Sequence, residues 1–354
     1  MVSNRRTVFV LGAGFTRAFL PSSPLMTDDY GVGRILHELG DLPTAKRILG
    51  QELERNGGEQ INIERLLTRL EGGMPYDVDR GAVEEIRLLA VGLRRALVDR
   101  IRSAREGKLQ IEALHSLARQ CLAGPIDCIS FNYDDVLDEA LYVVSRAPYL
   151  SPGRQWHPDA GYGFLCPSAQ AYAHRRGPAA NSSSLQLLKM HGSINWRIAL
   201  GAQHPYGLDA IVHDETWVDS PMDLEPLAKE QVDDHLEGEP FIVPPILAKS
   251  SLVEQPILRR IWSFAYRTLA QADRVIFIGY SLPLTDIAAG FLFRESLVRR
   301  PRPEVTVVNH GVDEKSRAAL RGSYRNVIPW LADDQFDFRG AMHWSQEWCD
   351  HAGR

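Results

Sequence analysis

The chain has 354 residues, of which 44% are hydrophobic, enough for a core in one large domain or two modest ones. A formal net charge of −5 gives no electrostatic reason to expect nucleic-acid binding. Its four cysteines form no CxxC pair, which predicts reduced thiols and a cytoplasmic protein. No apolar run approaches the roughly 18 to 20 residues of a membrane helix.

The first apolar run, residues 7–11, is short and unbroken, as is typical of a strand buried on both faces of a parallel sheet. The sequence GAGFT follows and is expected to open a helix. Gly12 permits a tight turn, and Gly14 lets the backbone come close to a diphosphate at the N-terminus of that helix. Arg17 stands where the full dinucleotide motif has its third glycine, so a plain strand-to-helix turn explains the loop about as well.

Residues 33–121 are predicted to be mostly helical. Apolar side chains recur there at spacings of three and four, the pattern of an amphipathic helix, at Ile86, Leu89, Leu93, Leu97 and Ile101. A shorter helix is expected around residues 61–70. We interpret this block as a helical insertion that covers the functional site.

Two further apolar strands end in polar residues. Residues 126–131 lead into the sequence NYDD, and a strand at about 185–190 leads directly into His191. Strand ends of a doubly wound sheet face the ligand crevice, so Asn132 and His191 are candidate functional residues. Asp135 is expected to cap the helix that follows. A lone histidine is more often structural than catalytic, and only its occurrence in order with GAGFT and NYDD favours a catalytic role.

The last third of the chain alternates between helix and strand. The predicted order is a helix at 257–271, a strand at 274–278, the loop GYSLPLTD, a helix at 287–297, a strand at 305–309 and a helix near 313–320. Such alternation predicts an α/β fold with a doubly wound, Rossmann-like parallel sheet. Its strands are far apart in sequence, so the sheet must be assembled discontinuously, from 1–32, 122–200 and 241–335. The other segments are predicted as a helical insertion at 33–121, an irregular surface insertion at 201–240 and a C-terminal tail at 336–354.

This ordered set of motifs resembles the sirtuin superfamily, and especially its bacterial sirtuin-like branch. The strand-end motif keeps Asn132 and Asp134 but has Phe131 in place of a glutamine, and His191-Gly192 matches the histidine–glycine pair. The sequences HGSINW and GYSLPLTD are typical of the sirtuin-like branch, as is Pro24-Leu25-Met26. The other matching residues are Gly12, Ala13, Gly14 and Thr16 in the glycine loop, Gly279-Tyr280-Ser281, and Asn309.

The resemblance implies that NAD is bound and cleaved as a substrate. Asn132 would orient the ribose and the attacking water, and His191 would act as the base, since an imidazole titrates at about pH 6.5. Asp134 would bond the ribose or the nicotinamide carboxamide. The other implied contacts are to the diphosphate, from Gly12, Ala13, Gly14 and Thr16, and to the adenosine, from Gly279, Ser281 and Asn309.

Sirtuin deacylases carry a structural zinc held by two CxxC pairs, which this chain lacks, so we expect no zinc. The first hypothesis is therefore an NAD hydrolase that yields nicotinamide and ADP-ribose, in this branch often a toxic effector of anti-phage defence. An NAD-dependent deacylase or ADP-ribosyltransferase is the second hypothesis, and a non-catalytic NAD or ADP-ribose sensor is the third. Because an unregulated NAD hydrolase would kill its host, we also expect a homo-oligomer or a regulatory partner protein.

Overall fold

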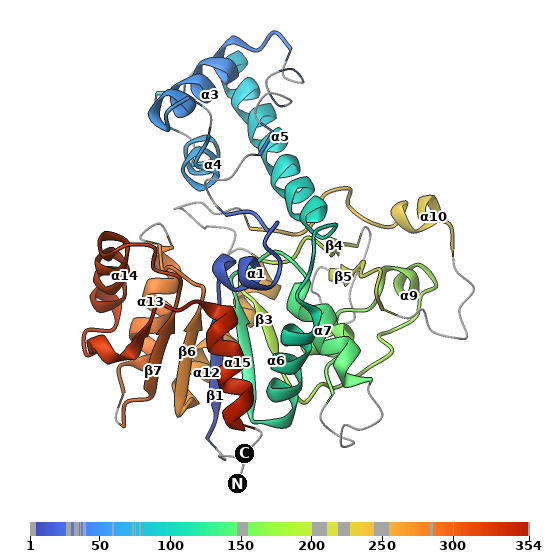
Figure 1. Ribbon diagram of the computed structural model, residues 1–354. Coiled ribbons are helices and arrows are strands. Elements are labelled where there is room, and N and C mark those ends of the chain that lie inside the picture. Colours follow the sequence, from blue (N-terminus) through green and yellow to red (C-terminus); the bar gives the residue numbers. More distant parts are fainter. Residues whose placement is uncertain are drawn as a thin grey trace.

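The structure is a computed structural model that describes residues 5–25, 30–31, 35, 37, 40–58, 60–72, 74, 76–77, 79–146, 155–199, 211–218, 227–243, 255–283, 286–299 and 301–352 (Figure 1). Its centre is a parallel sheet with the strand order β3-β2-β1-β6-β7-β8. The six strands are β1 (Thr7–Leu11), β2 (Ile126–Ser130), β3 (Leu187–Lys189), β6 (Arg274–Ile278), β7 (Glu304–Val308) and β8 (Phe336–Asp337). This arrangement confirms the predicted discontinuous, doubly wound sheet.

The order of the strands reverses between β1 and β6. From β1 the chain adds β2 and β3 on one side, and from β6 it adds β7 and β8 on the other. Leu11 at the end of β1 is in register with Ser130 of β2 and Ile278 of β6. The helices that follow β1 and β6 therefore cover opposite faces of the sheet, and this reversal at the carboxyl edge is where doubly wound sheets form a ligand crevice.

Helices cover both faces of the sheet (Figure 1). One layer is formed by helices that contact one another beside β1 and β2: α1 (Ala13–Phe19), α6 (Ile111–Ala123), α7 (Val136–Ser145) and α15 (Ala341–Ala352). The other layer contains α12 (Pro256–Gln271), α13 (Ile287–Leu297) and α14 (Glu314–Val327). The strands between them carry continuous apolar runs because both of their faces are buried.

A group of helices stands over the carboxyl edge of the sheet (Figure 1). It contains α3 (Pro43–Arg55), α4 (Ile63–Glu71) and the long α5 (Arg80–Ala104), and it has a hydrophobic core of its own. The predicted stripe from Ile86 to Ile101 is buried on the inner face of α5. Tyr133, which follows β2, belongs to the same core and so joins this insertion to the sheet.

Three predicted boundaries differ from the structure. The segment predicted as a tail contains β8 and α15, and Phe9 of β1 packs edge-on against Trp344 and Trp348 of α15 at 5.8 and 5.7 Å. The helix α6, predicted inside the insertion, packs beside the sheet. Of the segment 201–240, residues Ile211–His213 form β5, which pairs with β4 (Trp196–Ile198), and Lys229–Asp233 form α10. The elements in 201–240 span only 3 and 5 residues, too short to show a full strand or helical period.

Short helices complete the described structure: α8 (Pro158–Gly161), α9 (Ala169–Ala173) and the 3-10 turn η1 (Asp333–Gln335). Within the described ranges, no helix is long and apolar enough to cross a membrane.

Candidate functional site

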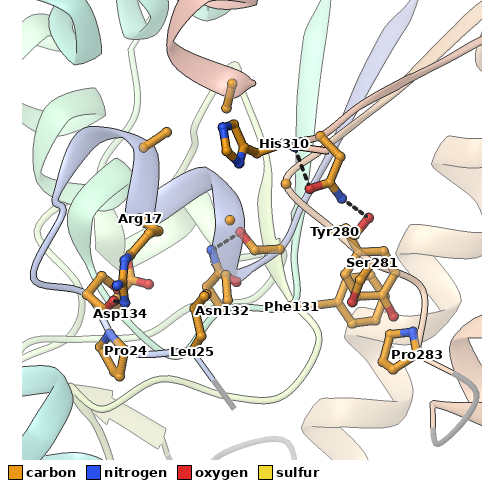
Figure 2. A pocket seen from close by; sticks show the side chains of 18 of the residues that line it. Arg17, Pro24, Leu25, Phe131, Asn132, Asp134, Tyr280, Ser281, Pro283 and His310 are labelled. Atoms are coloured by element: carbon orange, nitrogen blue, oxygen red, sulfur yellow. Dashed lines mark hydrogen bonds between the residues drawn. The ribbon is translucent and has the colours of Figure 1, made fainter. Parts of the chain in front are cut away.

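A cavity of about 820 Å³ lies at the carboxyl edge of the sheet, where the strand order reverses. Figure 2 shows Asn132 and Asp134 on one side of it and Tyr280 and Ser281 on the other. The structure brings nine of the ten sequence-predicted site residues to its wall: Gly12, Ala13, Gly14, Asn132, Asp134, His191, Gly279, Ser281 and Asn309. The tenth, Thr16, lies behind the wall and is 1% exposed.

The glycines of the site pack two loops against each other. The amide of Gly14 donates to the carbonyl of Gly279 at 2.9 Å, and the amide of Gly12 donates to the carbonyl of Ile278 at 3.1 Å. A Cβ on Gly12 would lie 2.5 Å from Cα of Tyr280, and Gly279 has a φ of +63°. These two amides are therefore bonded within the protein, and only glycine lets the loops approach so closely.

Asn132 is held in one orientation by the glycine loop. Its Nδ2 donates to the carbonyl of Gly12 and to Oγ1 of Thr16, both at 2.9 Å, while the hydroxyl of Thr16 donates to Oδ2 of Asp134 at 2.8 Å. Because the hydroxyl gives its proton to a carboxylate, it must accept from the amide nitrogen. The amide oxygen of Asn132 is then left as the acceptor on the cavity side, suited to a hydroxyl or a water.

The sequence prediction for Thr16 is corrected by this geometry, since its hydroxyl contacts Asn132 and Asp134 rather than the cavity. The distinction could not be read from the sequence, because GAGFT specifies the loop and not the direction of the hydroxyl. Thr16 positions the two residues that do line the cavity.

Asp134 lies beside a buried lysine that the sequence analysis missed. Lys189 is fully buried; its ammonium donates to the backbone carbonyl of Asp134 and lies 3.2 Å from Oδ1 of Asp138. Burial raises the pKa of Asp134, an effect that the charge of Lys189 and the hydroxyl of Thr16 oppose. A lysine inside an otherwise apolar strand was the available signal.

The predicted capping role of Asp135 is also corrected. The amide of Val136 bonds Oδ1 of Asp134 at 3.1 Å, and Asp135 makes no side-chain cap. Asp135 instead accepts from Trp217 at 2.8 Å and pairs with Arg105, which follows the last residue of α5. Its carboxylate thus ties the insertion to the segment after β5.

His191 also lines the cavity and is 5% exposed. Its ring contacts Phe131 edge-on at 5.2 Å, and its carbonyl accepts from the amide of Val243 at 2.8 Å. Its Nε2 lies 3.7 Å from Oδ2 of Asp286. Asp286 ends the GYSLPLTD motif, but its local sequence does not distinguish it from an ordinary helix cap.

The predicted adenosine side is formed by the loops after β6 and β7. Asn309 holds these loops together, because its Nδ2 donates to the carbonyl of Tyr280 at 3.2 Å and its Oδ1 accepts from the amide of His310 at 2.8 Å. Ser281 is exposed on the wall. The start of α15 also lines the cavity, through Gly340, Ala341 and Met342, which the prediction of a C-terminal tail had missed.

The insertion supplies one wall of the cavity. Glu64 from α4 and Leu97 and Ile101 from α5 line it, together with Tyr30. The amphipathic pattern predicted helices in this segment, and three of their side chains line the cavity. Only the tertiary structure shows that an individual residue such as Glu64 lines the cavity.

All four cysteines are free thiols, and Cys121, Cys128 and Cys166 are buried. Among the residues that the structure describes, no group of three or more histidine, cysteine, aspartate and glutamate side chains is placed to hold a metal ion.

By sequence, the chain matches no protein-family model and no curated protein. Its fold is similar to solved structures of Sir2 homologues. One, in complex with NAD, is 11% identical with a TM-score of 0.46, over 98% of this chain and 89% of that one. A mutant Sir2 homologue with ADP-ribose is 13% identical with a TM-score of 0.44, over 99% and 94%. A third, with 2′-O-acetyl ADP-ribose, is 13% identical with a TM-score of 0.46, over 99% and 92%.

Proposed function

We propose that the protein is an NAD glycohydrolase, which cleaves the nicotinamide–ribose bond of NAD to give nicotinamide and ADP-ribose. The observation that carries the proposal is the convergence of Asn132 and His191, 59 positions apart by their numbering, on one cavity that continues to the glycine loop. The cavity lies where doubly wound sheets bind nucleotides, and the motifs that form it resemble those of the sirtuin-like branch.

The reaction places few demands on the protein. When the nicotinamide–ribose bond breaks, its electron pair stays on the ring nitrogen, which becomes neutral, so the leaving group needs no general acid. The ribose develops oxocarbenium character, and water adds to the same carbon. In this proposal the amide oxygen of Asn132 orients that water or a ribose hydroxyl, and His191 accepts the proton that the water gives up.

The wall formed by the insertion favours water as the acceptor. Leu97 and Ile101 of α5 and Glu64 of α4 occupy the side of the cavity next to Tyr133. A protein deacylase or ADP-ribosyltransferase would need room there or elsewhere for a second macromolecule. This wall of helices with their own packed core supports a reaction between NAD and a small nucleophile.

The test is to incubate the purified protein with NAD and measure nicotinamide and ADP-ribose. Hydrolysis without an added acceptor is expected, and the variants His191→Ala and Asn132→Ala should each lose about 10²- to 10⁴-fold in kcat. Circular dichroism controls for folding. Release that requires an acyl-lysine peptide or a target protein would favour a deacylase or a transferase, and binding without turnover would favour a sensor. Wild-type turnover by His191→Ala would refute the assignment of the base.

We further propose that this hydrolysis serves anti-phage defence and is restrained by self-assembly or by a partner protein. The support is the resemblance of the motifs to the sirtuin-like branch, together with the toxicity expected of free NAD hydrolysis. The expected result is that infected cells with the wild-type protein lose NAD, while cells with the His191→Ala variant keep it. Light scattering of the purified protein would show a monomer if self-assembly plays no part.

A further inference from the structure

Asp286 contacts His191, Tyr280 and the start of α13, and the proposed mechanism gives it no role. It follows the loop after β6, lines the cavity and is 4% exposed. Its Oδ2 lies 3.7 Å from Nε2 of His191 and accepts the hydroxyl of Tyr280 at 2.9 Å. The same carboxylate precedes α13 and accepts from the amide of Ala289 at 3.4 Å.

We infer that Asp286 is a positioning residue that controls the protonation of His191, an inference that rests on the proposed NAD hydrolysis. A buried carboxylate that faces one imidazole nitrogen favours the tautomer with its proton on that nitrogen, here Nε2. It also stabilises the imidazolium that forms when His191 takes a proton from water. The proton remains on the imidazole during this step, and the carboxylate stays ionised.

The surroundings hold the pair in place. The ring of Tyr280 stacks on Phe131 at 4.5 Å, and Phe131 in turn contacts the ring of His191. The indole of Trp262 donates to the carbonyl of Met190 at 2.9 Å, which fixes the backbone just before the histidine. His191 is thus confined by the neighbouring rings of Phe131, Tyr133 and Trp262 and by main-chain bonds on both sides, so the direction of Nε2 is determined by packing.

Helix capping alone does not account for Asp286. The cap bond to Ala289 is long at 3.4 Å, and asparagine or serine would serve a cap as well as aspartate does. The oxygen that does not cap is the one aimed at Tyr280 and His191. What an aspartate adds at this position is a buried negative charge directed at an imidazole.

Other titratable groups also line this cavity and can affect the titration of His191. From the described elements these are Asp134 and Tyr133 after β2, Tyr280 after β6, Glu64 on α4, Arg17 on α1, His310 after β7 and Arg339 after β8. Burial raises the pKa of Tyr133 and of Tyr280 well above the ordinary range, so both phenols stay neutral near pH 7. Both carboxylate oxygens of Asp134 are bonded, to the hydroxyl of Thr16 and to the amide of Val136.

The decisive variant is Asp286→Asn, which keeps an oxygen to accept the cap bond, places an amide nitrogen beside Tyr280 and His191, and removes the charge. Its matched control is Asp79→Asn, the same substitution at the N-cap of α5, where Asp79 is exposed and accepts from the amide of Ala82 at 2.8 Å. Asp79 precedes Leu97, the first cavity residue of α5, by about 27 Å of helix at 1.5 Å per residue. The control should retain wild-type activity.

Two readouts separate this inference from the proposed function. The first is the titration midpoint of the His191 ring signal in NMR of histidine-labelled protein, assigned by its absence in His191→Gln. Asp286→Asn should lower it by at least about one pH unit, because an opposite charge within about 4–6 Å has that effect. Tyr280→Phe should raise this midpoint. The carboxylate of Asp286 then loses the hydrogen bond from the phenol, so its negative charge acts more strongly on the imidazole.

The second readout is the dependence of nicotinamide release on pH. Asp286→Asn should lower kcat at least about tenfold with KM nearly unchanged, and its acid limb should lie at lower pH than that of the wild type. An unchanged His191 midpoint in Asp286→Asn overturns the inference even if NAD is cleaved. If the wild type releases no nicotinamide, the proposed function fails, and the NMR titration still decides whether Asp286 controls His191.

Discussion

Replacing Thr16 with valine removes one hydroxyl and changes little else, since both side chains are β-branched and similar in size. The hydroxyl makes two buried hydrogen bonds, to Oδ2 of Asp134 at 2.8 Å and from Nδ2 of Asn132 at 2.9 Å. A bond to a charged group contributes about 1.5–3 kcal/mol and a neutral one about 0.5–1.5 kcal/mol. Thr16→Val should therefore lower the free energy of unfolding by about 2–4 kcal/mol.

The effect on catalysis should exceed the effect on binding. Without Thr16, the amide of Asn132 keeps only its bond to the carbonyl of Gly12 and can rotate. A misplacement of about 1 Å costs on the order of 10²-fold in rate, so kcat should fall by about that factor while KM changes less. The structure reverses the sequence-based expectation, in which the hydroxyl held the diphosphate and its loss weakened binding.

The assay combines urea denaturation with nicotinamide release at saturating NAD. Thr16→Ser is the matched control, because it keeps the hydroxyl and removes only a methyl group. The destabilisation by valine should also shrink at low pH. Burial raises the pKa of Asp134 above its ordinary 3.8, and the hydroxyl stabilises the ionised form, which is lost as the pH falls through that pKa. If Thr16→Val matches Thr16→Ser in stability and in kcat, the proposed positioning of Asn132 by Thr16 is refuted.

Three further predictions concern the rest of the molecule. Gly279→Ala should cost at least about 2 kcal/mol by urea denaturation, because φ is +63° and the new Cβ would lie 2.0 Å from the amide nitrogen of Phe15; a near-neutral result would mean that the two loops separate easily. Burial, with Asp135 and Asp138 nearby, raises the pKa of Glu215 well above 4.5. The folded state therefore holds a proton that the unfolded state releases, and the free energy of unfolding should decline as the pH rises above about 4.5. Denaturation at pH 5 and pH 8 should show a smaller decline for Glu215→Gln, and an equal decline would contradict the assignment. Elemental analysis of purified protein should find no stoichiometric zinc, and finding one would reopen the deacylase hypothesis.

Much of the sheet could be predicted from the sequence alone. Strands buried on both faces carry nearly continuous apolar runs, so Thr7–Leu11 and Arg274–Ile278 were recognised with their observed bounds. The stripe of α5 predicted a helix because its period matches 3.6 residues per turn. Asn132 and His191 were selected because polar residues at the ends of parallel strands must meet at one edge.

The direction of each side chain at that edge was decided only by the tertiary structure. Thr16 and Asp134 are 118 positions apart, and nothing local to either shows that they share a hydrogen bond. Asp286 has the local sequence of a helix cap, and its approach to His191 depends on β6 lying beside β1 and on the packing of Phe131 against Tyr280. Likewise, nothing in the sequence of α15 shows that its first residues line the cavity. That position follows from the packing of Trp344 against β1. The burial of an apolar face follows from local periodicity and can be predicted from the sequence. Hydrogen-bond partners depend instead on which distant segments the folded chain brings together.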